Sequence, residues 1–416
     1  MNIYFCGIGG VGIGPLAEIA FDAGHNVWGS DKNEGMVTKL LEARGISVSY
    51  DQSGDNLRAI NEQHPIDWFV YTAGITEEHP ELVTALSMGI RTSKRDELLS
   101  EIVEQKGLKL IGITGTHGKT TTTAMMIWTL KQLGIPISYS VGATMQFGPS
   151  GHFDPDSEYF VYECDEFDRN FLKFHPYLSI ITSIDYDHPD IYDSSEDYTR
   201  AFRKFIDQSA WTILWRSDAD KVGDVKNGWV LGDHDSADIR LAGQHNRDNA
   251  SQVIKAIERL GIKGDAVTAI NKFPGANRRF EKLANNLYTD YGHHPIEVEA
   301  TLQMAKEVAE KVVLVYQPHQ NVRQHELRSH YTNCFEQADT IYWLPTYLTR
   351  EDPELPVLTP SDLIQNVTNK DDVIISELDD NLWRQIQSEI DNGSLVLVMG
   401  AGSIDDWVRK ELRQKA

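Results

Sequence analysis

The amino-acid sequence predicts an α/β protein of three domains, each built around a parallel β-sheet. Short apolar runs alternate with amphipathic stretches of helical length along the chain, and this alternation is typical of βαβ units. Polar or Pro-Gly segments at residues 104–107 and 272–277 interrupt the pattern. We therefore expect domains of residues 1–105, 106–274 and 275–416. The expected strands are residues 2–6, 26–28, 68–71, 108–113, 159–162, 178–182, 312–316 and 394–399.

Composition limits the possible functions. The chain has 416 residues, 39 Lys and Arg against 62 Asp and Glu, and a net charge of −23, which argues against binding to a nucleic-acid backbone. Its three cysteines are widely spaced, so neither a disulfide framework nor a zinc motif is expected, and we expect a reducing, cytoplasmic compartment. No apolar run approaches the ~18 residues of a membrane helix, and the first residues indicate a buried strand rather than a signal peptide.

The first expected strand ends in a glycine-rich loop. Residues 7–12 read GIGGVG and are followed by an expected helix at residues 15–23. Asp31 follows Gly12 by 19 residues, the spacing of an acid that bonds a ribose hydroxyl. Such a loop lays a pyrophosphate on the amides of a helix N-terminus. The first domain is thus expected to bind a diphosphate nucleotide, and NAD, FAD and a UDP-sugar all fit.

A second phosphate-binding loop opens the central domain. Residues 111–120 read IGITGTHGKT and lie between the strand at residues 108–113 and an expected helix at residues 121–133. Gly118, Lys119 and Thr120 supply a backbone cradle, a cation for the β- and γ-phosphates and a hydroxyl for Mg²⁺. The strict P-loop pattern fails by one place, because residue 113 is Ile. We still expect ATP here.

Residues 114–120 (TGTHGKT) resemble the signature of the Mur ligase family, the ATP-dependent amide ligases of peptidoglycan precursor synthesis. Further segments resemble family motifs in order: residues 163–168 (ECDEFD), 183–190 (SIDYDHPD), 243–249 (GQHNRDN), 275–280 (GANRRF) and 399–404 (MGAGSI). The resemblance implies a Rossmann-like N-terminal domain for a UDP-sugar, a central P-loop ATPase-like domain and a Rossmann-like C-terminal domain for an amino acid.

Acidic and histidine side chains follow two expected strands of the central domain. Four carboxylates in residues 163–168 need a cation or basic ligand nearby, and His188 stands among acids after the next strand. By resemblance, Thr120, Glu163 and His188 hold Mg²⁺, with two ions expected.

Two residues of these motifs depart from the family pattern, because Cys164 and Ser183 stand where the family has Ala and Asn. Some members carry a carbamylated Lys whose counted position here falls near Phe202 or Arg203, neither of which fits; Lys204 is nearby, and the muramate–alanine branch lacks this Lys.

The last domain carries motifs of that branch. Residues 290–295 (DYGHHP) are characteristic of it, and residues 317–323 (QPHQNVR) resemble its Q-P-H-R-F-T-R. Arg323 matches the second Arg of this motif and is expected to bind the amino-acid carboxylate. Gln320 replaces the first Arg, so the identity of the amino acid stays open. In the first domain, residues 72–75 (TAGI) replace the branch's usual S-S-A-I.

The resemblance assigns residues to three sites. The ATP site comprises Gly115, Thr116, His117, Gly118, Lys119, Thr120, Thr121, His245, Asn246, Asn249, Arg278 and Asp290, with Arg278 favoured over Arg279. The sugar-nucleotide site comprises Gly7, Gly9, Gly10, Val11, Gly12, Asp31, Thr72 and Arg95. The amino-acid site comprises Tyr291, His293 and Arg323. The expected catalytic residues are Lys119, His188, Arg278 and His293.

The expected reaction joins UDP-N-acetylmuramate to an amino acid, with L-alanine favoured, through an acyl phosphate and with release of ADP and phosphate. One alternative is a recycling ligase that adds a murein tripeptide to the same sugar nucleotide. A second is an inactive nucleotide-sensing homologue, and a third is an NAD-dependent oxidoreductase built on the first glycine loop. A monomer or homodimer is expected, with no nucleic-acid partner and no membrane insertion.

Overall fold

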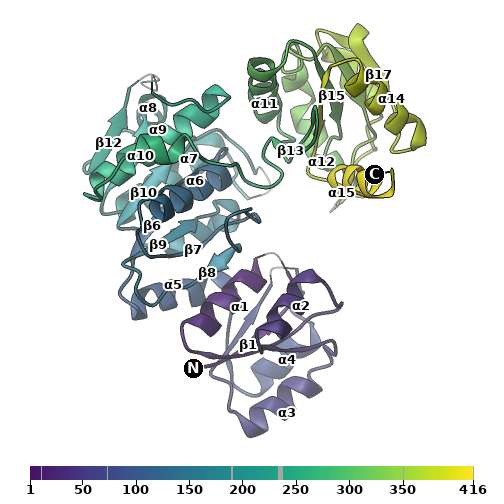
Figure 1. Ribbon diagram of the computed structural model, residues 1–416. Coiled ribbons are helices and arrows are strands. Elements are labelled where there is room, and N and C mark those ends of the chain that lie inside the picture. Colours follow the sequence, from purple (N-terminus) through teal and green to yellow (C-terminus); the bar gives the residue numbers. More distant parts are fainter. Residues whose placement is uncertain (11, 73, 189–190, 233–237, 350, 416) are drawn as a thin grey trace. The chain divides into compact units, whose positions relative to one another are not determined.

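The computed structural model describes residues 1–10, 12–72, 74–188, 191–232, 238–349 and 351–415. The chain divides into two compact units, and Figure 1 labels their helices and strands. The first unit contains Met1–Ala237 and Asn249–Phe273, and the second contains Asp238–Asp248 and Pro274–Ala416. Each unit is described by itself below.

The first sheet of unit 1 is entirely parallel, with strand order β3-β2-β1-β4-β5. The alternation along β1 sends Tyr4 and Cys6 into the core under α3 and α4, and Ile3 and Phe5 into the core with α1 and α5. Strand order reverses at β1, so the crevice beyond the ends of β1 and β4 is where ligands bind in such folds. The elements are β1 (Asn2–Cys6), α1 (Ile13–Asp22), β2 (Asn26–Ser30), α2 (Met36–Ala43), β3 (Ser47–Ser49), α3 (Asp55–Gln63), β4 (Trp68–Tyr71), α4 (Pro80–Ser87), β5 (Arg91–Ser93) and α5 (Arg95–Gln105).

The second sheet of unit 1 has the order β12-β11-β10-β6-β9-β7-β8, and within it β8 pairs antiparallel with β7. Strand β6 lies between β9 and β10, which brings the loops after these three strands to one edge. The elements are β6 (Lys109–Thr114), α6 (Lys119–Gln132), β7 (Ile137–Ser140), β8 (Gly151–His152), β9 (Tyr159–Glu163), η1 (Phe167–Lys173), β10 (Leu178–Ile181), α7 (Ser195–Gln208), β11 (Thr212–Trp215), α8 (Arg216–Val222), β12 (Gly228–Leu231), α9 (Gln244–Arg259) and α10 (Ala266–Ile270).

Unit 2 contains a six-stranded sheet with the order β13-β14-β18-β15-β16-β17, parallel except for the β13–β14 hairpin. Strand β18 lies between β14 and β15, so the segments after Asp290, Tyr316 and Met399 meet at one edge. The elements are β13 (Glu281–Ala284), β14 (Leu287–Asp290), α11 (Pro295–Val308), β15 (Val312–Tyr316), α12 (Asn321–Leu327), η2 (Arg328–Tyr331), β16 (Thr340–Trp343), α13 (Pro360–Leu363), η3 (Ile364–Asn366), η4 (Lys370–Asp372), β17 (Val373–Ile375), α14 (Asp380–Asp391), β18 (Leu395–Met399) and α15 (Ile404–Lys415).

The three-sheet α/β architecture confirms the fold expected from the sequence, but several helices begin earlier than expected. Helix α1 begins at Ile13 rather than at residue 15. Helix α6 begins at Lys119, directly after Gly118 with φ +82°. The sequence predicts a further helix only after the motif at residues 243–249, from residue 250, but α9 begins at Gln244, directly after Gly243 with φ +84°. His245 and Asn246 are therefore helical residues rather than loop residues. Across the described ranges, no helix is both long and apolar enough to cross a membrane.

Candidate active site

The phosphate loop follows β6 and is fixed against the segment after β10. A Cβ on Gly115, whose φ is +144°, would lie 2.1 Å from Thr182 Oγ1, so only glycine fits there. The backbone N–H of Thr116 donates to Ser183 O at 3.0 Å, and that of His117 donates to Ser183 Oγ at 3.0 Å. Ser183, which stands where the family usually has Asn, thus holds the loop through its hydroxyl.

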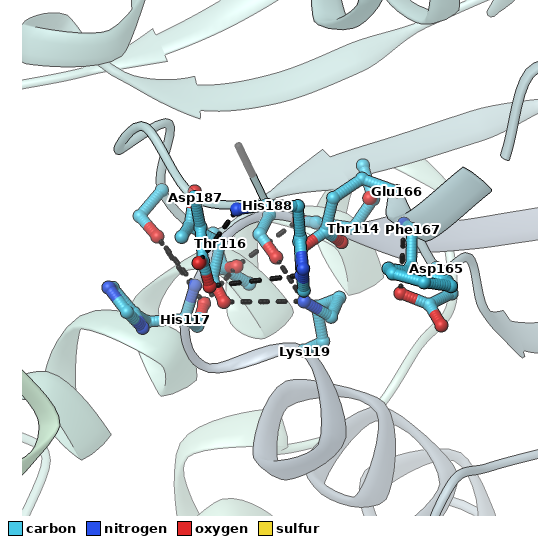
Figure 2. Close-up of polar contacts among 12 residues, drawn as sticks. Thr114, Thr116, His117, Lys119, Asp165, Glu166, Phe167, Asp187 and His188 are labelled. Atoms are coloured by element: carbon cyan, nitrogen blue, oxygen red, sulfur yellow. Dashed lines mark hydrogen bonds and ion pairs between the residues drawn. The ribbon is translucent and has the colours of Figure 1, made fainter. Parts of the chain in front are cut away.

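Lys119, in the first turn of α6, points back across the loop toward Glu166 (Figure 2). Its Nζ donates to Gly115 O at 2.6 Å and lies 2.9 Å from Glu166 Oε1. Glu166 is fully buried. Burial raises the pKa of Glu166 to about 7, and the nearby charge of Lys119 offsets part of that rise. Lys119 therefore carries its positive charge beside the buried carboxylate of Glu166.

Oxygen and nitrogen donors suited to a divalent cation surround this pair. Thr120 Oγ1 donates to Glu163 Oε1 at 2.8 Å, and Glu163 Oε2 accepts from the N–H of Gly142 at 2.8 Å. His188, with φ +58°, places Nε2 3.8 Å from Glu166 Oε1. Among the described residues, Glu166 Oε2 has no hydrogen-bond partner although it is buried. An orphaned carboxylate oxygen beside a hydroxyl, a second carboxylate and an imidazole fits the ligand preferences of Mg²⁺ and a phosphate-bound ion.

Other expected ATP residues lie around the same loop. Thr116 Oγ1 contacts Tyr198 OH at 2.9 Å and donates to Asp185 O at 2.7 Å. Thr121 is the third residue of α6. A Cβ on Gly118 would lie 2.9 Å from Asn249 Oδ1, so Asn249 packs directly on the loop. The structure thus places Asn249 beside the loop, and its contact with ATP stays a prediction.

His245 and Asn246 belong to unit 2, whereas Asn249 begins the part of α9 in unit 1. Burial lowers the pKa of His245 to about 4, so the ring is neutral. Asn246 Nδ2 donates to Ala242 O at 3.0 Å. Their relation to the nucleotide stays a prediction.

The first glycine loop gathers most of its expected partners. Asp31 Oδ2 accepts from the N–H of Gly9 at 2.8 Å, so this carboxylate stabilises the loop. A Cβ on Gly7 would lie 2.7 Å from Thr72 Cγ2, and one on Gly12 would lie 2.6 Å from Arg95 Nη1. The N–H of Gly10 donates to Gly7 O at 3.0 Å. Val11 lies outside the described residues.

Arg95 and its neighbour link this loop to the central sheet. Arg95 Nε lies 3.3 Å from Asp96 Oδ1, and Tyr162 OH donates to the same oxygen at 2.8 Å. Asp96 and Tyr162 are buried, and Tyr162 directly precedes Glu163 on β9. A chain of contacts therefore runs from β9, which ends at Glu163, to the first glycine loop. The sequence did not indicate the role of Tyr162 or Asp96, since no motif includes both.

Aromatic and cationic side chains gather at the ends of β14 and β15 in unit 2. Arg323 Nη1 donates to His293 Nε2, and His293 Nδ1 lies 3.2 Å from Tyr291 O. Burial lowers the pKa of His293 to about 4, so the neutral ring accepts from Arg323 and donates to Tyr291 O. His319 lies 5.3 Å from the His293 ring centroid and stacks on Tyr347. The sequence grouped His293 with Arg323 and Tyr291 but missed Tyr347, which lies in a proline-rich loop without a motif.

Asp290 and the paired arginines complete this edge. Asp290 is buried, and its two oxygens accept from the N–H groups of Gly292 and Phe280 at 2.7 Å each. Arg278 Nη2 donates to Gly400 O at 3.2 Å, and its Nε lies 3.4 Å from Asp405. The guanidinium carbons of Arg278 and Arg279 lie 4.7 and 5.3 Å from the Tyr291 ring centroid.

The carbamylated-Lys position is apolar or exposed in this chain. Phe202 is buried against Phe171, with ring centroids 5.2 Å apart, and Arg203 donates to Val222 O at 3.1 Å. Lys204 is exposed on α7. None of the three therefore presents a buried amine to the phosphate loop.

Three protein-family models match the chain. Residues 2–106 match the model described as "Mur ligase family, catalytic domain". Residues 113–229 match "Mur ligase middle domain", and residues 278–402 match "Mur ligase, glutamate ligase domain". The matches follow the order of the three sheets.

Curated relatives and solved structures agree with these models. The UDP-N-acetylmuramate--L-alanine ligase of Carboxydothermus hydrogenoformans is 30% identical, over 97% of this chain and 95% of that protein. That of Gloeobacter violaceus is 29% identical, over 99% and 95%. The crystal structure of the UDP-N-acetylmuramate-alanine ligase of Thermotoga maritima superposes with a TM-score of 0.76 at 26% identity, covering 100% of this chain and 99% of that one. A murein peptide ligase from Psychrobacter arcticus shares the fold, with a TM-score of 0.64 at 22% identity, over 99% of this chain and 98% of that one.

Proposed function

The chain belongs to the Mur ligase family of ATP-dependent ligases, and we propose that it joins the carboxylate of UDP-N-acetylmuramate to the amine of L-alanine. The curated relatives above carry this activity in their names. Membership of a ligase family removes the reason to consider an NAD-dependent oxidoreductase. The domain division at residues 1–105, 106–274 and 275–416 assigns the sugar nucleotide, ATP and the amino acid to one sheet each.

One observation carries the ATP-dependent step: Lys119, Thr120, Glu163, Glu166 and His188 converge at one edge of the central sheet. An amine does not displace oxygen from a free carboxylate, because the oxide that would have to leave the acyl carbon is a very poor leaving group. In the proposed reaction a carboxylate oxygen of the muramate attacks the γ-phosphorus and ADP leaves. The amine then attacks the acyl carbon, a proton departs from nitrogen, and phosphate leaves. Lys119 places a cation where negative charge on the transferring group grows, and such placement supplies most of the rate.

Magnesium is assigned to the same edge. Thr120, Glu163 and His188 would hold it, and a second ion would use the orphaned oxygen of Glu166. The ions supply positive charge among the ATP phosphates and the acyl group. His188 and Lys119 keep the Glu166 carboxylate pointed at this position.

The sugar nucleotide is assigned to the first sheet. The amides and close backbone of residues 7–12 suit a diphosphate, and Arg95, packed against Gly12, adds a cation. Asp31 and Thr72 flank the loop. Arg95 would contact the diphosphate while Asp96 holds its guanidinium from behind.

The amino acid is assigned to Tyr291, His293 and Arg323 of unit 2. Arg323 offers a guanidinium for the carboxylate, and the neutral His293 orients it. Gln320, with φ +60°, is the residue directly before α12, the helix that carries Arg323. Because Gln320 replaces an Arg of the branch pattern, the site has one cation fewer for the carboxylate. Amino acids other than L-alanine could therefore compete as acceptors.

The deciding experiment measures phosphate release with UDP-N-acetylmuramate, ATP and one acceptor at a time. L-Alanine, glycine, L-serine and the murein tripeptide are assayed side by side with Mg²⁺. We expect the highest kcat/KM with L-alanine. Preference for the tripeptide would assign the chain to recycling, and no release with any acceptor would favour a nucleotide-sensing homologue. We expect the enzyme to act in the cytoplasm, as a monomer or homodimer.

A further inference from the structure

Three metal-binding side chains meet beneath the first glycine loop, on the opposite face of the sheet from α1. Cys6 ends β1, and its side chain enters the core formed with α3 and α4. His79 caps α4, and Glu81 lies in the first turn of that helix. One donor atom from each of the three lies within 4.8 Å of the other two. Cys6 Sγ and His79 Nδ1 are 3.9 Å apart.

The cluster holds a buried carboxylate that accepts hydrogen bonds from neutral hydroxyls. Cys6 and Glu81 are 0% exposed, and His79 is half-buried. Glu81 accepts from Tyr4 OH at 2.8 Å and from Ser30 Oγ at 2.5 Å. Within the described ranges, no Lys or Arg forms an ion pair with Glu81. Neutral hydroxyl donors only partly compensate a carboxylate removed from water, so a positive charge at this position would be stabilising.

The donor types select one class of cation. A thiolate, an imidazole and a carboxylate together are ligands of Zn²⁺, and the thiolate sulfur excludes Mg²⁺ and Ca²⁺, which are hard cations that do not take sulfur ligands. Zn–S and Zn–N bonds of about 2.3 and 2.0 Å in a tetrahedron place S and N about 3.5 Å apart, close to the separation of Cys6 Sγ and His79 Nδ1. Gln52 Nε2 lies 3.7 Å from Cys6 Sγ, so the Gln52 amide borders the fourth position.

We propose that Cys6, His79 and Glu81 form a zinc site in the N-terminal sheet. The thiol proton of Cys6 leaves to solvent as the sulfur–zinc bond forms, and the imidazole of His79 binds as the neutral ring. Because zinc binding releases this proton, zinc binds more tightly as the pH rises. The site requires none of the ligase residues assigned above.

The site has a structural consequence for the glycine loop. Ser30 O accepts from the N–H groups of both Gly7 and Ile8 at 2.9 Å, and the hydroxyl of the same Ser30 donates to Glu81. Fixing Glu81 on zinc therefore fixes Ser30 and the first turn of the loop. Zinc bound to the folded state alone also raises the thermal midpoint of unfolding.

The test titrates the full chain, after chelator treatment and without nucleotide, with Zn²⁺ and with Co²⁺ as its spectroscopic substitute. We expect one tightly bound equivalent, a sulfur-to-cobalt charge-transfer band and a higher thermal midpoint. Cys6→Ala should abolish the band. His79→Asn changes a half-buried residue without opening the core, and should weaken zinc binding by more than about tenfold.

Matched variants separate this site from the rest of the protein. Cys334→Ala removes a buried thiol from the third sheet, and Glu163→Gln alters the magnesium edge. Both should retain the cobalt band and the zinc affinity. The proposal is overturned if the wild-type chain gives no band, if Cys6→Ala keeps it, or if His79→Asn binds zinc as tightly as the wild type. None of these readouts depends on ligase activity.

Discussion

Lys119 Nζ lies 2.9 Å from Glu166 Oε1. The pair lies at the edge of the central sheet where the loops after β6 and β9 meet. Glu166 is completely buried and the Lys119 side chain is 16% exposed. The Glu166 carboxylate thus stabilises the Lys119 ammonium inside the loop when no anionic ligand is bound. In the proposed function, a triphosphate would compete with Glu166 for Lys119, and Glu166 would then be free to hold a metal ion.

Lys119→Ala is expected to lower phosphate release by at least ~10²-fold, because a charge aimed at the transferring group is lost. The loss should appear in kcat, with a smaller change in the KM for the amino acid. Lys109→Ala is the control, since Lys109 lies on the adjoining strand β6 and pairs with exposed Glu158. Normal turnover in Lys119→Ala, with normal turnover in the control, would remove the proposed role in ATP chemistry.

Glu166→Gln is expected to change how stability depends on pH. The pKa of Glu166 is raised from 4.5 to about 7 in the folded protein, so folding takes up a proton between these values. Raising the pH through this window therefore lowers the free energy of unfolding, by up to about 3 kcal/mol. The variant lacks this contribution. The thermal midpoint of unfolding should fall further between about pH 5 and pH 8 in the wild type than in Glu166→Gln. Parallel changes in the two proteins would contradict a raised pKa.

The sequence located the strands well where an apolar run has polar neighbours at both ends. Residues 2–6, 68–71 and 312–316 match β1, β4 and β15 residue for residue. The wrong start of α9 has a physical cause: Asn and Asp favour helix caps, and here they occupy helical positions instead. The glycine before them, with its positive φ, was the better signal for the turn.

The candidate site was predictable as a set of loops but not as a set of contacts. Parallel strands bring their carboxyl ends to one edge, so the sequence grouped Lys119 with Glu163 and His188. It did not single out Glu166, because four carboxylates in one short run are indistinguishable before burial is known. The contact between Tyr162 and Asp96 joins strand β9 to helix α5, and no local pattern encodes a pairing over 66 residues.

Tyr162→Phe tests whether that contact positions Arg95. Removal of the hydroxyl leaves the buried Asp96 short of one donor, at a cost of about 1–3 kcal/mol. We expect the KM for UDP-N-acetylmuramate to rise by up to about tenfold, with kcat less affected. Tyr159→Phe removes a hydroxyl from the same strand and should leave that KM unchanged. Equal effects of the two variants would indicate a general loss of stability rather than positioning.

Arg278→Ala and Arg279→Ala distinguish the two neighbouring arginines. We expect Arg278→Ala to lower kcat by ~10²-fold and Arg279→Ala to change it by less than about threefold. The fold should tolerate the first change, because Asp405 still pairs with Arg409 at 3.0 Å. Steady-state kinetics with thermal midpoints for both variants check this. The reverse order of effects would assign the ATP contact to Arg279.

Arg323→Ala is expected to raise the KM for L-alanine by about 10- to 100-fold, because the guanidinium that would bind the carboxylate is lost. The KM for ATP should stay within about twofold. Arg328→Ala, an exposed cation just beyond α12, serves as the control. An unchanged KM for L-alanine would place the amino acid elsewhere in the protein.

Gln320→Arg adds a guanidinium one turn before Arg323 and tests the same site in the opposite direction. Two cations should bind the carboxylate more tightly than one, so we expect the KM for L-alanine to fall by about tenfold. The gain should vanish in the Gln320→Arg, Arg323→Ala double variant if both groups hold one carboxylate. It should also shrink below about pH 5. The pKa of His293 is about 4, so acid begins to charge the ring that accepts from Arg323, and the two cations then repel each other. A gain that persists in acid would show that the introduced guanidinium binds the carboxylate without the His293–Arg323 pair.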